Sequence, residues 1–419
     1  MLRPVWPSAV IVAALAVPAC AVAAEPVSLP ASAPVASPAP SSASSPFGFE
    51  WNARLRNEFV DDDAFASTSN ATTLRLRAGL RMRWAHGFSA LLEGEGIASA
   101  GDRYNSGANG VTTRPAITDP EGAELNQAYL AWKGGHAGAT LGRQRLLFDN
   151  QRWIGNSGWR QNEQAFDAVA FDVGLQPGLT ARYAWLDRVH RVNGDQARDV
   201  LARERNLDSH AFNLAWKHGV QQLVGYAYLH DDRDVATAST ATWGLRAVTD
   251  TVHDGRGWAL ALEWAQQGDY ADNPLSFSHQ YWLVEPAFTR NGIAWRAGWE
   301  HLGGNGRHAL QTPLATLHAF NGWADKFLVT PPAGLEDRYL AAGGALGHGA
   351  TLAKFKWALV WHDYRADSGS QDYGQEWNAS LGFPVHGKLS GLAKLADYRS
   401  DGFARDTTKL WLQLEWAQP

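Results

Sequence analysis

The sequence is poor in cysteine and has no long apolar run. Cys20 is the only cysteine among the 419 residues, and it lies in a segment typical of an export signal. Cleavage after Ala23 or Ala24 would remove it, which excludes disulfides, thiolate catalysis and cysteine-based metal sites in the exported chain. After Pro46, no apolar stretch approaches the roughly 20 residues that a transmembrane helix needs. A helical membrane span is therefore excluded.

Charge is also scarce. Charged residues make up 19% of the chain, below the usual share of about 25% in globular proteins. The net charge is only −5, which gives no electrostatic reason to expect nucleic acid or an acidic partner.

Residues 1–24 have the pattern of a signal peptide. Arg3 supplies one positive charge, "AVIVAALAV" a short apolar run, and "AVAA" a small-residue cleavage site. Lipoprotein processing at "VPAC" is the alternative, although Pro18 fits poorly before a modified cysteine. Residues 25–46 are rich in Pro, Ala and Ser, which predicts a disordered or extended linker. This leaves 47–419 for the folded domain.

The remainder of the chain alternates apolar and polar residues, which predicts β-strands with one apolar face. In the last segment, "TTKLWLQLEW", Leu410, Leu412 and Leu414 share one face, while Lys409 and Glu415 lie on the other. The pattern predicts about eighteen strands. They cover 49–59, 72–84, 88–98, 124–133, 138–148, 163–173, 179–188, 208–217, 221–230, 242–248, 257–266, 278–288, 292–301, 337–345, 350–363, 373–382, 388–398 and 407–416.

Segments 72–84 and 88–98 flank a tight turn, so their register can be predicted. Apolar residues then face apolar or small ones and arginine meets carboxylate, which specifies the register well. The predicted pairs are Trp84 with Phe88, Met82 with Ala90, Leu80 with Leu92, Gly79 with Glu93, and Arg77 with Glu95.

Connections between the segments alternate between short and long. The long ones include 101–123, 189–207 and 302–336. Short turns on one rim, long loops on the other and an even strand number are typical of bacterial outer-membrane barrels, whose short turns face the periplasm. We therefore predict an all-β fold, a closed antiparallel transmembrane barrel of about eighteen strands in the outer membrane, with both termini in the periplasm.

A soluble β-sandwich is the alternative fold. Its core would be tightly packed, yet the apolar faces here often carry Ala, Gly and Thr, which would leave voids. Arginine occupies four of the five alternate positions of 75–83, with Arg75 and Arg77 roughly 7 Å apart on a strand, inside the screening length of about 8–10 Å. A wet lumen lined with carboxylates would accommodate that row.

Aromatic residues near strand ends are typical of lipid-interface girdles, and core filling is their alternative role. They are Trp51, Trp84, Phe88, Trp132, Trp216, Trp299, Trp361 and Trp416.

Four stretches carry a family resemblance: "LRLRAGLRMRW", "LLEGEGI", "DPEGAELNQAYLAW" and "LGRQRLLFDNQRWIGNSGWRQNEQAFD". The chain resembles the alginate export family of outer-membrane porins, most strongly over 74–167. The resemblance implies an eighteen-stranded barrel, and it implies an arginine-rich conduit like the one that passes an anionic polyuronate in the alginate-transporting member.

Candidate pore-lining residues follow from the polar strand faces and from the dense polar loop after residue 148. Arginine forks suit carboxylate ligands, and rings of arginine favour anions. The alternative is that the loop arginines only form ion pairs with Asp149, Glu163 and Asp167, which hold the loop inside the barrel mouth. The candidates are Arg54, Arg56, Arg75, Arg77, Arg81, Arg83, Glu93, Glu95, Arg143, Arg145, Arg152 and Arg160.

No motif indicates a catalytic or metal site, and no cofactor is expected. "GDRYNSGANG" lacks the ending of a phosphate-binding loop, and His301, His308 and His362 lack ligand spacing. We expect a passive porin for hydrophilic, anionic, sugar-acid-like or polyuronate solutes. An outer-membrane lipase-type barrel and a soluble periplasmic glycan-binding protein are the alternatives. A lipase-type barrel would need a Ser–His pair at the outer rim. The neighbours Ser209–His210 and Ser278–His279 would each point to opposite faces of a strand, so neither pair would form such a site. Expected partners are outer-membrane lipid, the solute or an anionic polysaccharide, and the barrel-assembly machinery, which reads a last strand like 407–416.

Overall fold

The computed structural model describes residues 46–347 and 354–417. The expected signal peptide, and the expected linker apart from Pro46, lie outside the described residues. Within these described residues there are eighteen strands and four short helices. The strands are β1 (Phe47–Asp62), β2 (Ser69–Arg83), β3 (Phe88–Ser99), β4 (Gly122–Lys133), β5 (Ala137–Gln144), β6 (Ala165–Gln176), β7 (Leu179–His190), β8 (Glu204–His218), β9 (Gln221–His230), β10 (Thr240–Asp250), β11 (Gly257–Asp269), β12 (Ser278–Arg290), β13 (Ile293–Leu302), β14 (Leu335–Ala345), β15 (Lys356–Arg365), β16 (Asp372–His386), β17 (Leu389–Ser400) and β18 (Thr407–Ala417). The helices are η1 (Ala85–Gly87), α1 (Val200–Arg203), η2 (Ala236–Ala238) and η3 (Leu317–Ala319).

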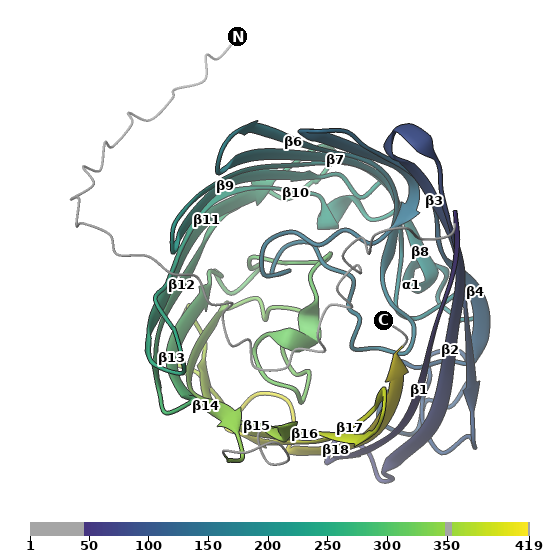
Figure 1. The fold of residues 1–419 in the computed structure, drawn as a ribbon. Helices are drawn as coiled ribbons and strands as arrows, with labels where there is room; N and C mark the ends of the chain where they lie inside the picture. Colours follow the sequence, from purple (N-terminus) through teal and green to yellow (C-terminus); the bar gives the residue numbers. More distant parts are fainter. Residues whose placement is uncertain (1–45, 348–353, 418–419) are drawn as a thin grey trace, which may run out of the picture.

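The strands close into one antiparallel barrel, which confirms the predicted fold class. Each strand pairs with its neighbours in sequence, and β1 closes the ring by pairing with both β2 and β18. Figure 1 shows this ring. Connections after even-numbered strands are mostly short, as at 134–136, 177–178 and 291–292, and those after odd-numbered strands include all the long ones. We call the two ends the short-turn rim and the long-loop rim.

Among the described residues, no helix is long and apolar enough to cross a bilayer.

The apolar faces of the strands point outward. Leu76 and Leu80 are 50% and 42% exposed, whereas Arg75 and Arg77 on the alternate face are 1% and 5% exposed. The predicted β2–β3 register is confirmed, including Arg77 opposite Glu95. An outward apolar belt of this kind is what lipid tails require and what a soluble sandwich would bury.

Tryptophans mark both ends of the outward belt. Trp84, Trp132 and Trp216 are exposed near the short turns, and Trp243 and Trp377 are exposed toward the long-loop rim. The amphipathic indole ring suits the boundary between lipid tails and headgroups.

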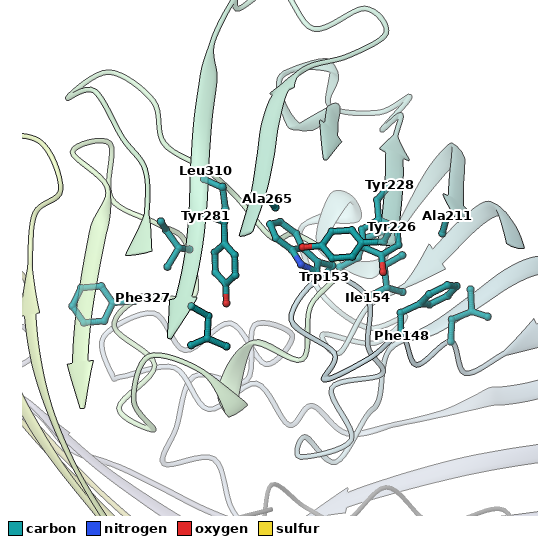
Figure 2. Close-up of a cluster of buried hydrophobic side chains, with 14 of the residues drawn as sticks. Phe148, Trp153, Ile154, Ala211, Tyr226, Tyr228, Ala265, Tyr281, Leu310 and Phe327 are labelled. Atoms are coloured by element: carbon teal, nitrogen blue, oxygen red, sulfur yellow. The ribbon is translucent and has the colours of Figure 1, made fainter. Parts of the chain in front are cut away.

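The interior of the barrel contains an apolar core as well as polar groups. Two long connections, the β5–β6 loop (145–164) and the β13–β14 loop (303–334), fold inside the ring of strands (Figure 1). Trp153 of the first loop packs edge-on against Tyr281 at 5.3 Å and lies 6.0 Å from Tyr226 (Figure 2). A lumen that is simply water-filled, as the sequence suggested, is therefore wrong for this part of the barrel.

Two predicted strands extend well beyond the strands of the structure. Segment 138–148 ends as a strand at Gln144, two residues after Gly142, whose φ is +119°. Only glycine adopts this conformation readily. Segment 350–363 begins as β15 at Lys356, and its residues 350–353 lie outside the described part of the chain.

Candidate functional site: a loop-narrowed pore

The two inward loops pair with each other across the lumen. Ile154 and Leu314 form a parallel β-bridge. Gly155 N donates to the Leu314 carbonyl at 2.9 Å, and Thr316 N donates to the Gln151 carbonyl at 3.0 Å. These backbone bonds make one compact obstruction from segments that lie about 160 positions apart in the sequence.

A cavity of about 400 Å³ remains between the loops and the strand wall. Arg54, Arg77 and Arg145 lie on one side of it. Glu285, Glu300 and Asp337, which come from β12 to β14, lie on the other. Aromatic rings add to the lining, at Trp159, Phe320 and Trp323. The cavity is therefore lined by arginines, carboxylates and ring faces, which together can hold and orient a hydrophilic anion.

Strand arginines hold the backbone of the β5–β6 loop. Arg54 Nη1 donates to the Gly158 carbonyl at 3.1 Å, and Arg56 Nη2 to the Trp159 carbonyl at 2.6 Å. Arg77 Nη2 reaches the Gln161 carbonyl at 3.2 Å. These carbonyls have no ladder partner in a loop, so the arginines satisfy acceptors that burial would otherwise leave unpaired.

Glu163 is the ionic centre of the loop. It accepts from Arg145, lies 3.3 Å from Arg77 Nη1, and accepts from Asn126 and Asn156 at 2.7 and 2.8 Å. Burial alone would raise the pKa of Glu163, but Arg145 and Arg77 outweigh it and lower that pKa to about 2. Glu163 is therefore ionised throughout the physiological range.

Arg152 and Arg160 pair with residues outside their own loop. Arg152 Nε lies 2.8 Å from Glu300 Oε1, and its guanidinium stacks 4.7 Å from the Phe320 ring. Arg160 pairs with Glu58 at 3.2 Å and with Asp325 at 3.1 Å. Both arginines are buried, so their role in the resting loop is structural pairing.

A buried lysine completes the narrowing, and the sequence analysis missed it. Lys394 Nζ lies 2.9 Å from His318 Nε2 and 3.8 Å from the ring centroids of Trp159 and Trp323. Since an ionised carboxylate can only accept, His318 Nδ1 carries the proton donated to Asp325 at 2.7 Å, and His318 Nε2 accepts from Lys394. Burial, followed by Lys394, lowers the pKa of His318 to about 3, so His318 stays neutral. The contributing residues lie far apart in sequence, so no local motif signals the group.

The remaining strand candidates lie inside the barrel with partners. Arg81 pairs with Glu50 at 2.5 Å, and Arg75 lies 3.3 Å from Glu415. Glu95 pairs with Arg77, and Glu93 lies 3.1 Å from Arg145 Nη2. Arg83 has the same inward parity but is exposed at the short-turn rim.

Arg143 is the exception, because the register places it on the outer face. It stands opposite Ala128, on the side where Leu130 and Leu141 are exposed. It pairs with Asp167 at 2.9 Å. The sequence placed Arg143 and Arg145 on one strand face; since β5 ends at Gln144, Arg145 instead enters the lumen. The ion pairs expected with Glu163 and Asp167 form, whereas Asp149 accepts from Asn213 at 2.8 Å.

Two constellations that the sequence did not indicate arise from folding. His301, Glu336 and Asp367 bring potential ligand atoms within 4.8 Å of one another. Ser209 Oγ lies 3.1 Å from His230 Nδ1, with both residues buried. In each of the sequence pairs Ser209–His210 and Ser278–His279, one residue is buried and the other is more exposed. This agrees with the prediction that the two residues of each pair point to opposite faces.

Comparisons with known proteins agree with this architecture. The chain is similar in structure to Acinetobacter baumannii OccAB2, with a TM-score of 0.68, 12% identity, and 88% of this chain and 98% of that chain covered. It is also similar to Pseudomonas aeruginosa OccK3 (OpdO), with a TM-score of 0.64, 16% identity, and 88% and 95% covered. A third similar structure is Pseudomonas aeruginosa OpdK with vanillate, with a TM-score of 0.67, 11% identity, and 88% and 98% covered. These likenesses concern the fold.

No curated protein matches the chain. The family model for alginate export matches residues 45–301, more than half of the sequence. The chain therefore belongs to the alginate export family and is a porin of the bacterial outer membrane.

Proposed function

We propose that this porin passes small hydrophilic anions of the sugar-acid or polyuronate type. The observation that carries the proposal is the charge of the cavity between the loops. Five arginines, one lysine and four carboxylates line it, so the basic groups outnumber the acidic ones. The arginines are Arg54, Arg77, Arg145, Arg246 and Arg296, the lysine is Lys394, and the carboxylates are Glu163, Glu285, Glu300 and Asp337. Such an excess favours anions, and the nearby carboxylates keep binding weak enough for release.

The size of the cavity supports a small cargo or a short stretch of a polymer. A volume of about 400 Å³ lies at the lower end of the roughly 300–1,000 Å³ typical of small-molecule sites. The vanillate of the OpdK structure is itself a small carboxylate, which is consistent with anionic cargo on this fold. An anionic polysaccharide remains a proposed partner, as does the barrel-assembly machinery.

We further propose that the barrel is not an enzyme. Ser209 and His230 are buried within the barrel wall, whereas a lipase-type site needs its serine at a lipid-accessible surface. The outward apolar belt also argues against a soluble glycan-binding protein, because such a belt would aggregate in water.

Arg145, which enters the lumen, and Arg143, which lies on the outer face, provide a matched test of anion preference. Reversal potentials in a planar bilayer should show that wild type prefers anions, and Arg145→Ser should weaken this preference. A unit charge about 4 Å from a passing ion is worth about 1 kcal/mol in a water-like medium, so the anion/cation permeability ratio should fall by up to about fivefold. Arg143→Ser removes the same charge from the outer face and should leave the ratio unchanged.

The proposal fails if wild type has no anion preference, or if both variants behave alike. Heat-modifiable gel migration of each variant checks that the barrel has closed.

A further inference from the structure

Four exposed cations surround the lumen at the short-turn rim, and we name them the mouth ring: Arg83 on β2, Lys133 on β4, Lys217 on β8 and Lys356 on β15. Each lies at an inward position of its strand. Trp132 and Trp216, the preceding residues, are exposed on the outer face. Lys356 lies on the same face of β15 as Ala358 and Val360, which are buried inside the barrel.

The mouth ring differs from the arginines deeper in the lumen. Arg54, Arg77 and Arg145 all have carboxylate partners. Within residues 46–347 and 354–417, the four ring side chains have no ion pair or side-chain hydrogen bond. Their charge is therefore available to a ligand.

Two of the nearby carboxylates are already paired with other arginines, Glu50 with Arg81 at 2.5 Å and Asp172 with Arg182 at 2.9 Å. Asp250 accepts from the Val252 backbone N–H at 2.8 Å, and Asp254 lies beside His253 at 3.2 Å. These contacts leave Asp250 and Asp254 as two carboxylates against the four cations of the ring.

We infer that the mouth ring is a capture site for polyanionic solute at the short-turn end of the pore. The inference rests on the proposed anion transport. It adds a binding site, the mouth ring, and the end of the pore at which the solute is first bound. The inward parity points the charges at the axis rather than at lipid headgroups. In outer-membrane barrels this rim faces the periplasm, so the ring would gather uronate chains on that side. Convergent charge at a channel mouth raises association rates by about 10- to 1,000-fold, and salt suppresses the effect.

The experiment measures capture from each side. Single channels in a planar bilayer receive an oligogalacturonate of defined length in one compartment, and the rate of current blockade is recorded. Their orientation is determined by labelling Ser67→Cys, exposed in the β1–β2 connection, in a Cys20→Ser background. We expect blockade from the short-turn side to begin at least about tenfold faster than from the long-loop side at low salt. The difference should shrink at 1 M salt.

Paired double variants locate the charges responsible. Lys133→Gln with Lys217→Gln should slow blockade from the short-turn side severalfold. Arg256→Gln with Arg290→Gln removes two cations from the same rim, one in a turn and one beside the exposed, outward Phe288, and should change it little. All these side chains are exposed, so folding should be preserved.

Equal blockade rates from both sides, or equal slowing by the two double variants, would overturn the inference; the second result would indicate a diffuse field or lipid contact. Reversal potentials in the same bilayers test the proposed function separately. Anion preference that depends on Arg145 without any difference between sides refutes the capture site alone.

Discussion

Replacing Trp153 by alanine should detach the β5–β6 loop from the barrel wall and open the pore. The Trp153 side chain is 6% exposed, packs against Tyr226 and Tyr281, and donates from Nε1 to Glu263 Oε1 at 2.8 Å. Removing a buried tryptophan costs about 3–5 kcal/mol. Glu263 would retain Arg246 at 2.6 Å and Tyr226 at 2.7 Å, so the variant leaves no unpaired charge.

The lost energy should appear in loop docking rather than in barrel stability, because Trp153 belongs to no strand. At 1.4 kcal/mol per factor of ten, the open fraction of the loop should rise about a hundred- to several-thousand-fold. Single-channel recordings should then show frequent bursts of larger conductance. Trp153→Phe keeps an aromatic ring and loses the hydrogen-bond donor. The frequency of its large-conductance bursts should therefore lie between those of wild type and Trp153→Ala.

The matched control is Trp243→Ala, which removes a tryptophan that is 52% exposed on the outer face and should leave conductance unchanged. An unchanged conductance for Trp153→Ala, together with unchanged protease resistance of 145–164, would refute the reasoning. It would mean that the ionic contacts of Glu163 and Arg160 hold the loop without the aromatic core.

Three further predictions follow from named contacts. First, the lowered pKa of Glu163, about 2 against an ordinary 4.5, stabilises docking above pH 4.5; as pH falls toward 2, up to about 3 kcal/mol should be lost. Acid should therefore raise conductance in wild type, and Glu163→Gln should abolish that part of the pH dependence. Second, Leu76→Arg places a charge on the outward belt and should cost about 2–4 kcal/mol in urea refolding into bilayers, whereas Leu76→Phe should cost little. Third, a Cβ at Gly298 would lie 2.0 Å from the Tyr339 ring, so Gly298→Ala should destabilise the barrel by about 1–3 kcal/mol; unchanged thermal migration on gels would contradict this.

The strands could be predicted from the sequence because their signal is local. Alternation of apolar and polar residues fixes which face meets lipid, and Trp84 to Phe88 fixes a register through one tight turn. The same alternation placed Arg75 and Arg77 inside correctly, since their own strand contains the information.

The interior could not be predicted in the same way, because its contacts join distant segments. Lys394, His318 and Asp325 meet only when the β13–β14 loop enters the barrel. Arg143 was misplaced because it was grouped with Arg145, although within β5 it shares the face of the exposed Leu141, and only Arg145, beyond the strand end at Gln144, enters the lumen. The filled lumen was missed because the loop after residue 148 was interpreted from its polar residues alone, and the contact of its Trp153 with Tyr281 of β12 joins two distant segments.

We expect loop position and ion preference to be coupled in this barrel, because the arginines proposed to select anions also hold the loop. Arg54, Arg56 and Arg77 donate to carbonyls of the docked β5–β6 loop. Undocking removes those acceptors and turns the guanidinium groups toward the solution in the pore. The large-conductance bursts of Trp153→Ala should therefore also be more anion-selective than its closed-loop level, with reversal potentials shifted accordingly. A loop that acted only as a steric obstacle would change conductance and leave the reversal potential constant. Recording both quantities within single bursts distinguishes the two cases, and a constant reversal potential would refute the coupling.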